Sequence, residues 1–136
     1  MVRFGISLHK GLLDKFDAFI RAAGYRNRSA AIRDIVRDFL VAREWEAGAH
    51  DIAAVVAIVY DTASHDMLAR LQKVKAARRE FIRSTTQHAL HEQYTLEVIV
   101  LSGAADSVKK AADALIGCRG VIHGTVTPTM PGPPCD

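Results

Sequence analysis

The first eight residues hold one short strand pattern whose pairing partner is missing from the sequence that follows. Residues 3–8 alternate between small or polar and apolar side chains, which places the two kinds on opposite faces of an extended chain. A lone strand of this length is unstable, and the next 40 residues have the periodicity of helices instead. The economical solution is a second copy of the chain, whose identical strand pairs antiparallel with this one.

The resulting two-stranded ribbon would have one apolar and one polar face. Its apolar residues would be buried on the helices of both chains, and Arg3, Gly5 and Ser7 would lie on the outer face. A ribbon of this size fits the major groove of DNA, where arginine prefers O6 and N7 of guanine. By themselves these are ordinary exposed residues, but the ribbon pattern favours DNA contact.

Two amphipathic helices are predicted after this strand. Apolar residues recur at three- and four-residue steps over Lys10–Ala23, and Gly24 is the residue type that ends helices in a left-handed conformation. Ser29 has the character of an N-cap for the second helix. That helix has an apolar stripe of its own: Ile32, Ile35, Val36, Phe39 and Leu40. We expect both stripes to form a core shared with the partner chain, and residues 44–50 to be the helix tail and a linker.

The sequence pattern changes after residue 50. Ile52–Tyr60 is a near-continuous apolar run, as in a buried strand. The segments that follow predict a helix, two strands of a hairpin, a second helix and a last strand: Asp66–Phe81, Ile82–Leu90, Tyr94–Leu101, the residues after Gly103, and Gly120–Thr127. The order βαββαβ is the ferredoxin-like motif that small regulatory ACT-type domains also use. We therefore predict an α+β protein, with a ribbon-helix-helix over residues 1–48, a regulatory domain over 51–128 and a flexible tail over 129–136.

Charge and composition restrict the class of protein further. Residues 1–48 hold nine Lys/Arg and six Asp/Glu, whereas the remainder is balanced, so the excess positive charge lies with the predicted head. No apolar run approaches the length of a membrane span, and the start lacks an apolar signal segment. The two cysteines, Cys118 and Cys135, do not make a disulfide framework. We expect a cytoplasmic protein without a membrane partner.

The turn between the predicted helices carries a family resemblance. Gly24–Ser29 followed by Ala31–Asp34 resembles the helix-turn-helix segment of NikR, the family of nickel-responsive repressors. The similarity continues without a gap over nearly the whole chain: Val59-Tyr60, Asp66, Leu96-Glu97, Val100-Leu101 and Arg119–Gly124. The resemblance implies a head that binds a double-stranded DNA operator and a C-terminal domain that senses an effector. Gly5 departs from the family, which usually has a polar residue there, so the operator is expected to differ.

The start of the second helix supplies further DNA-binding candidates. Asn27, Arg28 and Ser29 lie where a helix N-terminus presents unpaired N–H groups and a partial positive charge, an arrangement that binds phosphates. Arg28 adds a full charge. Ser29 can act as a capping residue alone, which is compatible with this role.

The resemblance also implies a metal site that this chain does not match. NikR holds nickel in a square-planar site shared between two subunits, with three histidines and one cysteine as ligands, a set that suits Ni(II). The corresponding positions are Ala76, Gln87, Ala89 and Thr95, none of which supplies the expected ligand. We therefore predict that the usual nickel site is absent.

Two histidines near the predicted hairpin turn leave another metal possible. His88 and His91 could bind a divalent transition metal together with ligands from another chain, although a spacing of three puts them on opposite faces of a strand. Isolated histidines are more often structural or solvated. The residues alone thus do not identify the cofactor, and only the resemblance implies nickel. We expect His123 and Cys118 to be structural.

The function that these patterns favour is a DNA-binding repressor. It would form a homodimer through the ribbon and a homotetramer through the C-terminal domains, which would sense an effector. The alternative is an ACT-type ligand-binding or antitoxin-like assembly module that uses the head only to dimerise; Arg3 and Ser7 on the outer face favour DNA. No arrangement of nucleophile, base and acid and no phosphate-binding glycine loop is recognisable, so we predict no enzyme activity.

Overall fold

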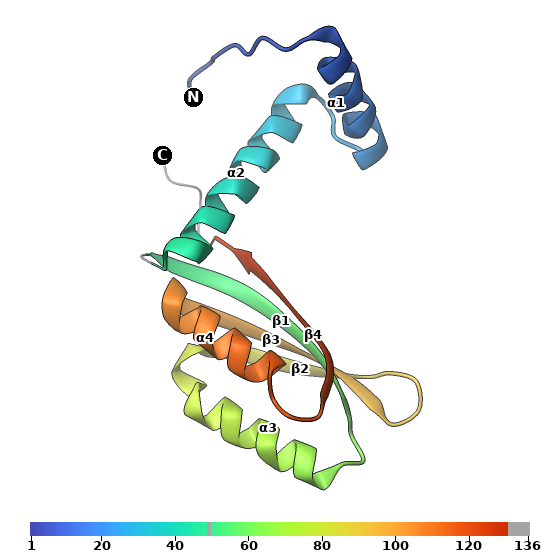
Figure 1. The fold of residues 1–136 in the computed structure, drawn as a ribbon, viewed down its shortest axis with the longest axis vertical. Coiled ribbons are helices and arrows are strands. Elements are labelled where there is room, and N and C mark those ends of the chain that lie inside the picture. The colour runs from blue at the N-terminus through green and yellow to red at the C-terminus, as the bar shows by residue number, and fades with distance from the viewer. Residues whose placement is uncertain (49, 131–136) are drawn as a thin grey trace. The chain divides into compact units, whose positions relative to one another are not determined.

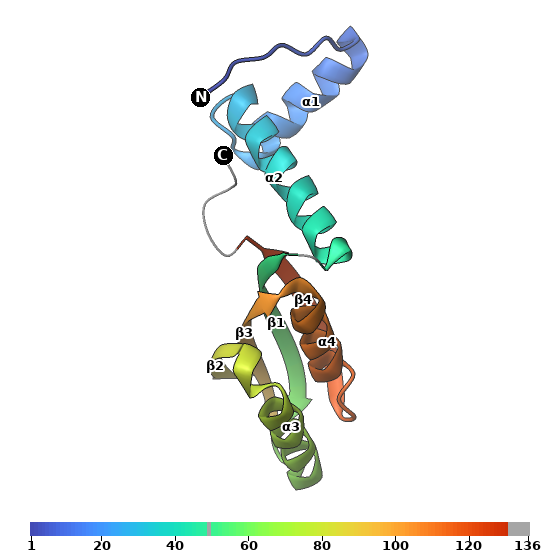
Figure 2. The same ribbon diagram turned by 90° about the vertical axis from the view of Figure 1, so that its left-hand side faces the viewer.

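The computed structural model describes residues 1–48 and 50–130, and the chain forms two compact units. The first is Met1–Phe39 and the second is Leu40–Asp136 (Figures 1 and 2). Among the described residues, no helix is long and apolar enough to cross a membrane.

The first unit is a pair of helices joined by a short turn. Helix α1 (Lys10–Ala23) has the predicted bounds, and Gly24 follows it with φ 81°, the left-handed conformation that its position predicts. The N–H of Tyr25 donates to the carbonyl of Ile20, and the Tyr25 hydroxyl donates to Asp34 Oδ2 at 2.8 Å. These bonds close α1 and tie the turn to the helix that follows.

The second helix, α2 (Arg28–Ala47), begins one residue before the predicted cap, Ser29. The N–H of Ala30 donates to Asn27 Oδ1 at 2.9 Å, so Asn27 is the capping residue and Ser29 lies inside the helix. The predicted Ser29 cap is therefore wrong. Asparagine and serine cap equally well, and here the position next to the turn decides between them.

The strand that the sequence predicts at residues 3–8 is not formed in the single chain. Residues 1–9 lie outside any helix or strand. Strand pairing requires a neighbouring backbone, and within the part of the chain that the structure describes no segment pairs with these residues. The ribbon consequently stays a prediction for the dimer.

Helix α2 belongs to both units. The boundary between them falls between Phe39 and Leu40, inside the helix and before the end of the head that we predicted at residue 48. Val41 and Trp45 pack against the core of the second unit. The end of α2, which includes the helix tail predicted from residue 44, thus packs on the second unit's core.

The second unit has the predicted βαββαβ order. Its elements are β1 (Asp51–Asp61), α3 (His65–Ala77), the short 3₁₀ helix η1 (Arg79–Phe81), β2 (Ile82–Ala89), β3 (Tyr94–Ala104), α4 (Ala105–Ile116) and β4 (Val121–Thr129). The strands form one antiparallel sheet in the order β2-β3-β1-β4. Helices α3 and α4 cover one of its faces (Figures 1 and 2). This arrangement confirms the α+β, ferredoxin-like prediction.

Alternation along the strands places the core between the sheet and the helices. Ala54, Val56 and Ile58 of β1 are fully buried there, together with Leu115 of α4. Cys118 is buried in the same cluster, as a small core residue. The Ser64 side chain caps α3 by accepting from the N–H of Met67.

The last strand extends further than predicted. Pro128 and Thr129 pair with Ala54 and Ala53 of β1, so the strand continues two residues past its predicted end at 127, and Thr129 lies in the strand rather than in the predicted tail. Both lie on an edge strand, where proline is tolerated because its nitrogen need not donate. The rest of the predicted tail, residues 131–136 with Cys135, lies outside the described residues.

The other face of the sheet carries no helix of this unit. Its central strands present small and branched apolar side chains that are partly exposed, among them Val55, Val59 and Val98. Polar residues flank them on the outer strands, including Thr86 and His88 on β2 and His123 on β4. We call this surface the open sheet face.

Candidate DNA-binding surface and effector site

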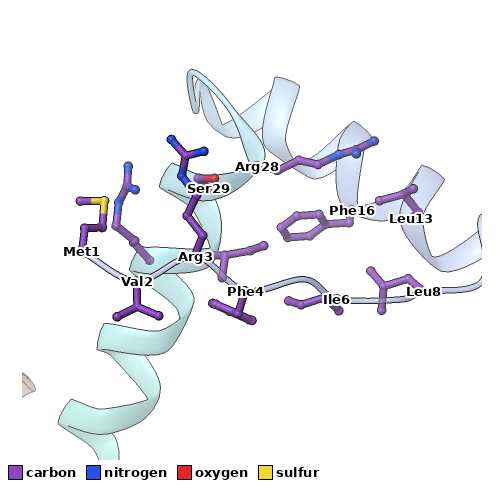
Figure 3. A pocket seen from close by; sticks show the side chains of 12 residues that line it. Met1, Val2, Arg3, Phe4, Ile6, Leu8, Leu13, Phe16, Arg28 and Ser29 are labelled. Atoms are coloured by element: carbon purple, nitrogen blue, oxygen red, sulfur yellow. The ribbon is translucent and has the colours of Figure 1, made fainter.

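A hollow of about 670 Å³ lies between the N-terminal segment and the two helices of the first unit. Figure 3 shows Phe4, Ile6 and Leu8 along the extended segment, with Phe16 and Leu13 of α1 above them. Arg28 and Ser29 at the start of α2 line the same hollow (Figure 3). The N-terminal segment and the start of α2, which both carry predicted DNA-binding residues, therefore lie around one depression.

Apolar side chains are unusually exposed in this unit. Phe4, Ile6 and Leu8 are 74%, 55% and 45% exposed, and only Ile20 and Ala31 are buried. The helices expose further large apolar residues: Leu12, Phe19, Ile35, Val36 and Phe39. An apolar surface of this extent on so small a unit indicates an interaction site.

The predicted base-contacting residues lie in the extended segment. Arg3, Gly5 and Ser7 are exposed, and a side chain at Gly5 would meet no atom within 4 Å. None of the three makes a side-chain hydrogen bond or ion pair with another described residue. They are free to contact a ligand.

Arg28 is held by an acidic residue of α1. Its Nε and Nη2 donate to Asp17 Oδ1 and Oδ2 at 2.9 and 2.8 Å, a bidentate pair that joins α1 to the start of α2. The hydrogen bond from Arg28 holds the pKa of the Asp17 carboxyl below its ordinary value, and the pair raises that of Arg28. A phosphate at this helix end would compete with Asp17 for the guanidinium.

The second unit contains a buried ionic cluster around Glu97. This residue points from β3 towards the helices and is 0% exposed. The Tyr60 hydroxyl and Gln87 Nε2 donate to Glu97 Oε1 at 2.7 and 3.1 Å, and Lys75 Nζ lies 2.6 Å from Oε2. We call Tyr60, Lys75, Gln87 and Glu97 the Glu97 cluster. It joins β1, α3, β2 and β3.

Electrostatics keep the Glu97 carboxyl charged. Burial opposes its ionisation, but the contacts from Lys75, Tyr60 and Gln87 outweigh burial and hold the pKa of Glu97 below its ordinary value. Burial and the neighbouring carboxylate raise the pKa of the Tyr60 hydroxyl, which stays protonated and donates. The cluster is balanced in charge, with one cation and one anion.

Sequence reasoning missed this cluster. One feature of the sequence could have revealed it. Glu97 lies on the same side of its strand as Thr95, Ile99 and Leu101, the side that faces the core. A carboxylate at such a position requires a partner. The sequence does not show which cation on α3 supplies it.

None of the four positions that the family resemblance assigns to nickel ligands offers the expected ligand here. Gln87 donates to Glu97, the Thr95 hydroxyl is hydrogen-bonded to that of Thr62, and Ala76 and Ala89 have no side-chain donor atoms. These residues do not fit a square-planar site of three imidazoles and a thiolate.

Within the described part of the chain, no hydrogen bond joins the two candidate histidines. His88 lies on β2 opposite Leu96, on the open sheet face, whereas His91 lies in the turn with Nε2 3.3 Å from Glu92 Oε1. Within residues 1–48 and 50–130, no group of three or more His, Cys, Asp or Glu side chains could hold a metal ion. His123 lies on β4 opposite Val59, also on the open sheet face.

Known proteins resemble both units. Residues 53–129 match the family model of the NikR C-terminal nickel-binding domain, and residues 2–43 match that of the CopG-family ribbon-helix-helix proteins. The chain also resembles an uncharacterized protein from Thermotoga maritima, with a TM-score of 0.51 and 15% identity, over 58% of this chain and 98% of that one. At this identity the likeness concerns the fold alone.

Curated relatives match over nearly the full length. A protein of Pyrococcus furiosus is 41% identical over 97% of this chain and 96% of its own. One from Geobacter sulfurreducens is 40% identical over 96% and 94%. Both carry the name "Putative nickel-responsive regulator". With both family models and these identities, the chain belongs to the NikR family of transcriptional regulators, whose C-terminal domain is described as nickel-binding.

Proposed function

We propose that the chain is a DNA-binding repressor that acts as a homotetramer and that does not sense nickel through the family's square-planar site. The observation that carries this proposal is the exposed N-terminal segment, in which the apolar residues Phe4, Ile6 and Leu8 alternate along the sequence with Arg3, Gly5 and Ser7. A repressor of this kind works in the cytoplasm, where its operator lies.

Dimerisation follows from the exposed apolar surface of the first unit. Burying the side chains of Phe4, Ile6 and Leu8 in a partner chain contributes about 1.5–3 kcal/mol each, which favours association strongly. The same step supplies residues 3–8 with a strand to pair with, which a single chain lacks.

The polar side of the ribbon then provides the base-reading surface. In the paired ribbon Arg3 and Ser7 of both chains face outward, and Gly5 lets the backbone approach the base edges closely. Asn27, Arg28 and Ser29 at the start of α2 are suited to phosphate contacts, because the helix N-terminus carries a partial positive charge. Binding by Arg28 requires that it leave Asp17 or share its donors with it.

The open sheet face supports association of dimers. Its partly exposed apolar centre and polar flanks have the composition of a protein interface. Tetramerisation through this face would fix the distance between two ribbons, and an effector that biases the arrangement of the C-terminal domains would change operator affinity.

Selection of genomic DNA fragments with the purified full chain tests the proposal. We expect enrichment of a palindromic sequence, and binding of that sequence by the tetramer without added nickel. If no fragment is retained more strongly than random DNA, the repressor function is refuted and the alternative, an assembly module that uses the head only to dimerise, is favoured. A strict requirement for stoichiometric nickel would refute the second half of the proposal.

A further inference from the structure

A cavity of about 480 Å³ opens between the end of α3 and the edge strand β2. This volume is within the range of roughly 300–1,000 Å³ that is typical of small-molecule sites. Five of its seven lining residues are polar and come from α3, η1 and β2: Gln72, Lys75, Arg79, Thr85 and Gln87. Ala76 and Ile82 add two apolar patches, and no acidic side chain lines it.

The wall offers more hydrogen-bond donors than acceptors. Lys75 has three N–H groups and is 13% exposed, and its recorded partner is Glu97, which is fully buried. Arg79 has five N–H groups and forms no ion pair or side-chain hydrogen bond with any residue that the structure describes. A ligand that complements this wall must accept hydrogen bonds.

The charge of the wall points to an anion. Lys75 is neutralised by Glu97, whereas the guanidinium of Arg79 has no neutralising carboxylate in the described part of the chain. An anion bound beside Arg79 would meet a planar fork of donors, which matches the geometry of carboxylates and phosphate-like groups. The apolar patches leave room for a short hydrocarbon part.

We propose that this cavity binds a small oxygen-bearing anion, held by Arg79 with help from Lys75 and Thr85. The shared chemistry is that of inorganic oxyanions and of the carboxylates of small organic acids. Because Lys75 also holds Glu97, a bound anion would share a side chain that links α3 to β3. Its effect on DNA affinity rests on the proposed repressor function, whereas the binding itself does not.

Calorimetric titration of the full chain tests the site. The probes are inorganic phosphate, sulfate, acetate and succinate, so that inorganic ions and organic carboxylates are separate arms. Removing a charge-assisted contact costs enough that Arg79→Gln should weaken binding about tenfold or more. Thr85→Val, which removes a hydroxyl without changing charge, should weaken it less.

A neighbouring arginine provides the matched control. Arg78 does not line the cavity, so Arg78→Gln should change affinity by no more than about twofold, through screened long-range charge alone. Absence of binding by all four probes at millimolar concentration would overturn the proposal, and so would equal losses in the two arginine variants. If the chain binds an anion but no DNA, the proposed anion site is supported and the proposed repressor function is refuted.

Discussion

Replacement of Lys75 by methionine tests whether the cation that pairs with the buried Glu97 stabilises the second unit. The substitution keeps the volume of the side-chain stem and removes the ammonium group that lies 2.6 Å from Glu97. Glu97 stays at a position with 0% exposure and loses its charged partner. Lys75→Met should therefore destabilise the folded chain.

The magnitude follows from the environment of the pair. Removing one partner of a buried ion pair costs about 3–5 kcal/mol. Tyr60 and Gln87 continue to donate to Glu97 and Lys75 is partly exposed, which places the loss near the lower end, about 3 kcal/mol. Lys73→Met, an exposed lysine on the same helix, is the control and should change stability by no more than about 0.5 kcal/mol.

The pH dependence provides a second, independent readout. In the parent, the folded pKa of Glu97 lies below its ordinary value of 4.5, so the stability that it contributes is complete above that value and is lost as the pH falls through the folded pKa. In Lys75→Met, burial dominates and raises the pKa of Glu97, so that folding takes up a proton. The variant should then gain stability as the pH falls from about 7 to about 5.

Urea unfolding of the full chain at one protein concentration measures both effects. The double variant Lys75→Met, Glu97→Gln should recover part of the loss, because no buried charge is left without a partner. A loss below about 1 kcal/mol in Lys75→Met at neutral pH, with the pH dependence of the parent, would show that the ion pair is not the source of stability.

Three further predictions concern DNA and nickel. Arg3→Ala should weaken specific binding by about 1–3 kcal/mol and relax base preference in a competition assay. Arg28→Ala should weaken binding to all duplexes and lower the salt dependence by about one unit of slope, measured by titration at several salt concentrations; unchanged binding in both variants would exclude the ribbon as the reading surface. Stoichiometric Ni(II) should give no near-ultraviolet thiolate-to-metal band, because Thr95 stands where the family resemblance implies a cysteine; appearance of the band would contradict the ligand assignment.

The parts of the fold that the sequence predicted are those with a strong local period. The apolar stripe of α1 ends at a glycine, and the helix has the bounds that this pattern predicts, about Lys10 to Ala23. The strands and helices of the second unit follow from alternation and from three- and four-residue steps, which burial on one face imposes directly.

The parts that were missed depend on contacts between distant residues or between chains. Alternation put Glu97 on the inward face, but the choice of Lys75 as its partner depends on how α3 packs on the sheet. Likewise, the apolar stripe of α2 does not show that Val41 and Trp45 pack with the second unit. The strand at residues 3–8 needs a second chain, so neither the single sequence nor the single fold tests it.

Helix α2 contributes residues to both units, and this limits where the domains of this protein can be exchanged with those of other proteins. Regulators are often treated as a head and a sensor that can be exchanged at a linker. Here a sensor fragment that begins at β1 would lack Val41 and Trp45 and leave their places on its core unfilled. A head fragment that ends at residue 48 would carry both side chains without the surface that buries them. Chimeras should therefore keep α2 residues 40–47 with the C-terminal unit, so that the fusion point lies within a helix and must preserve its phase.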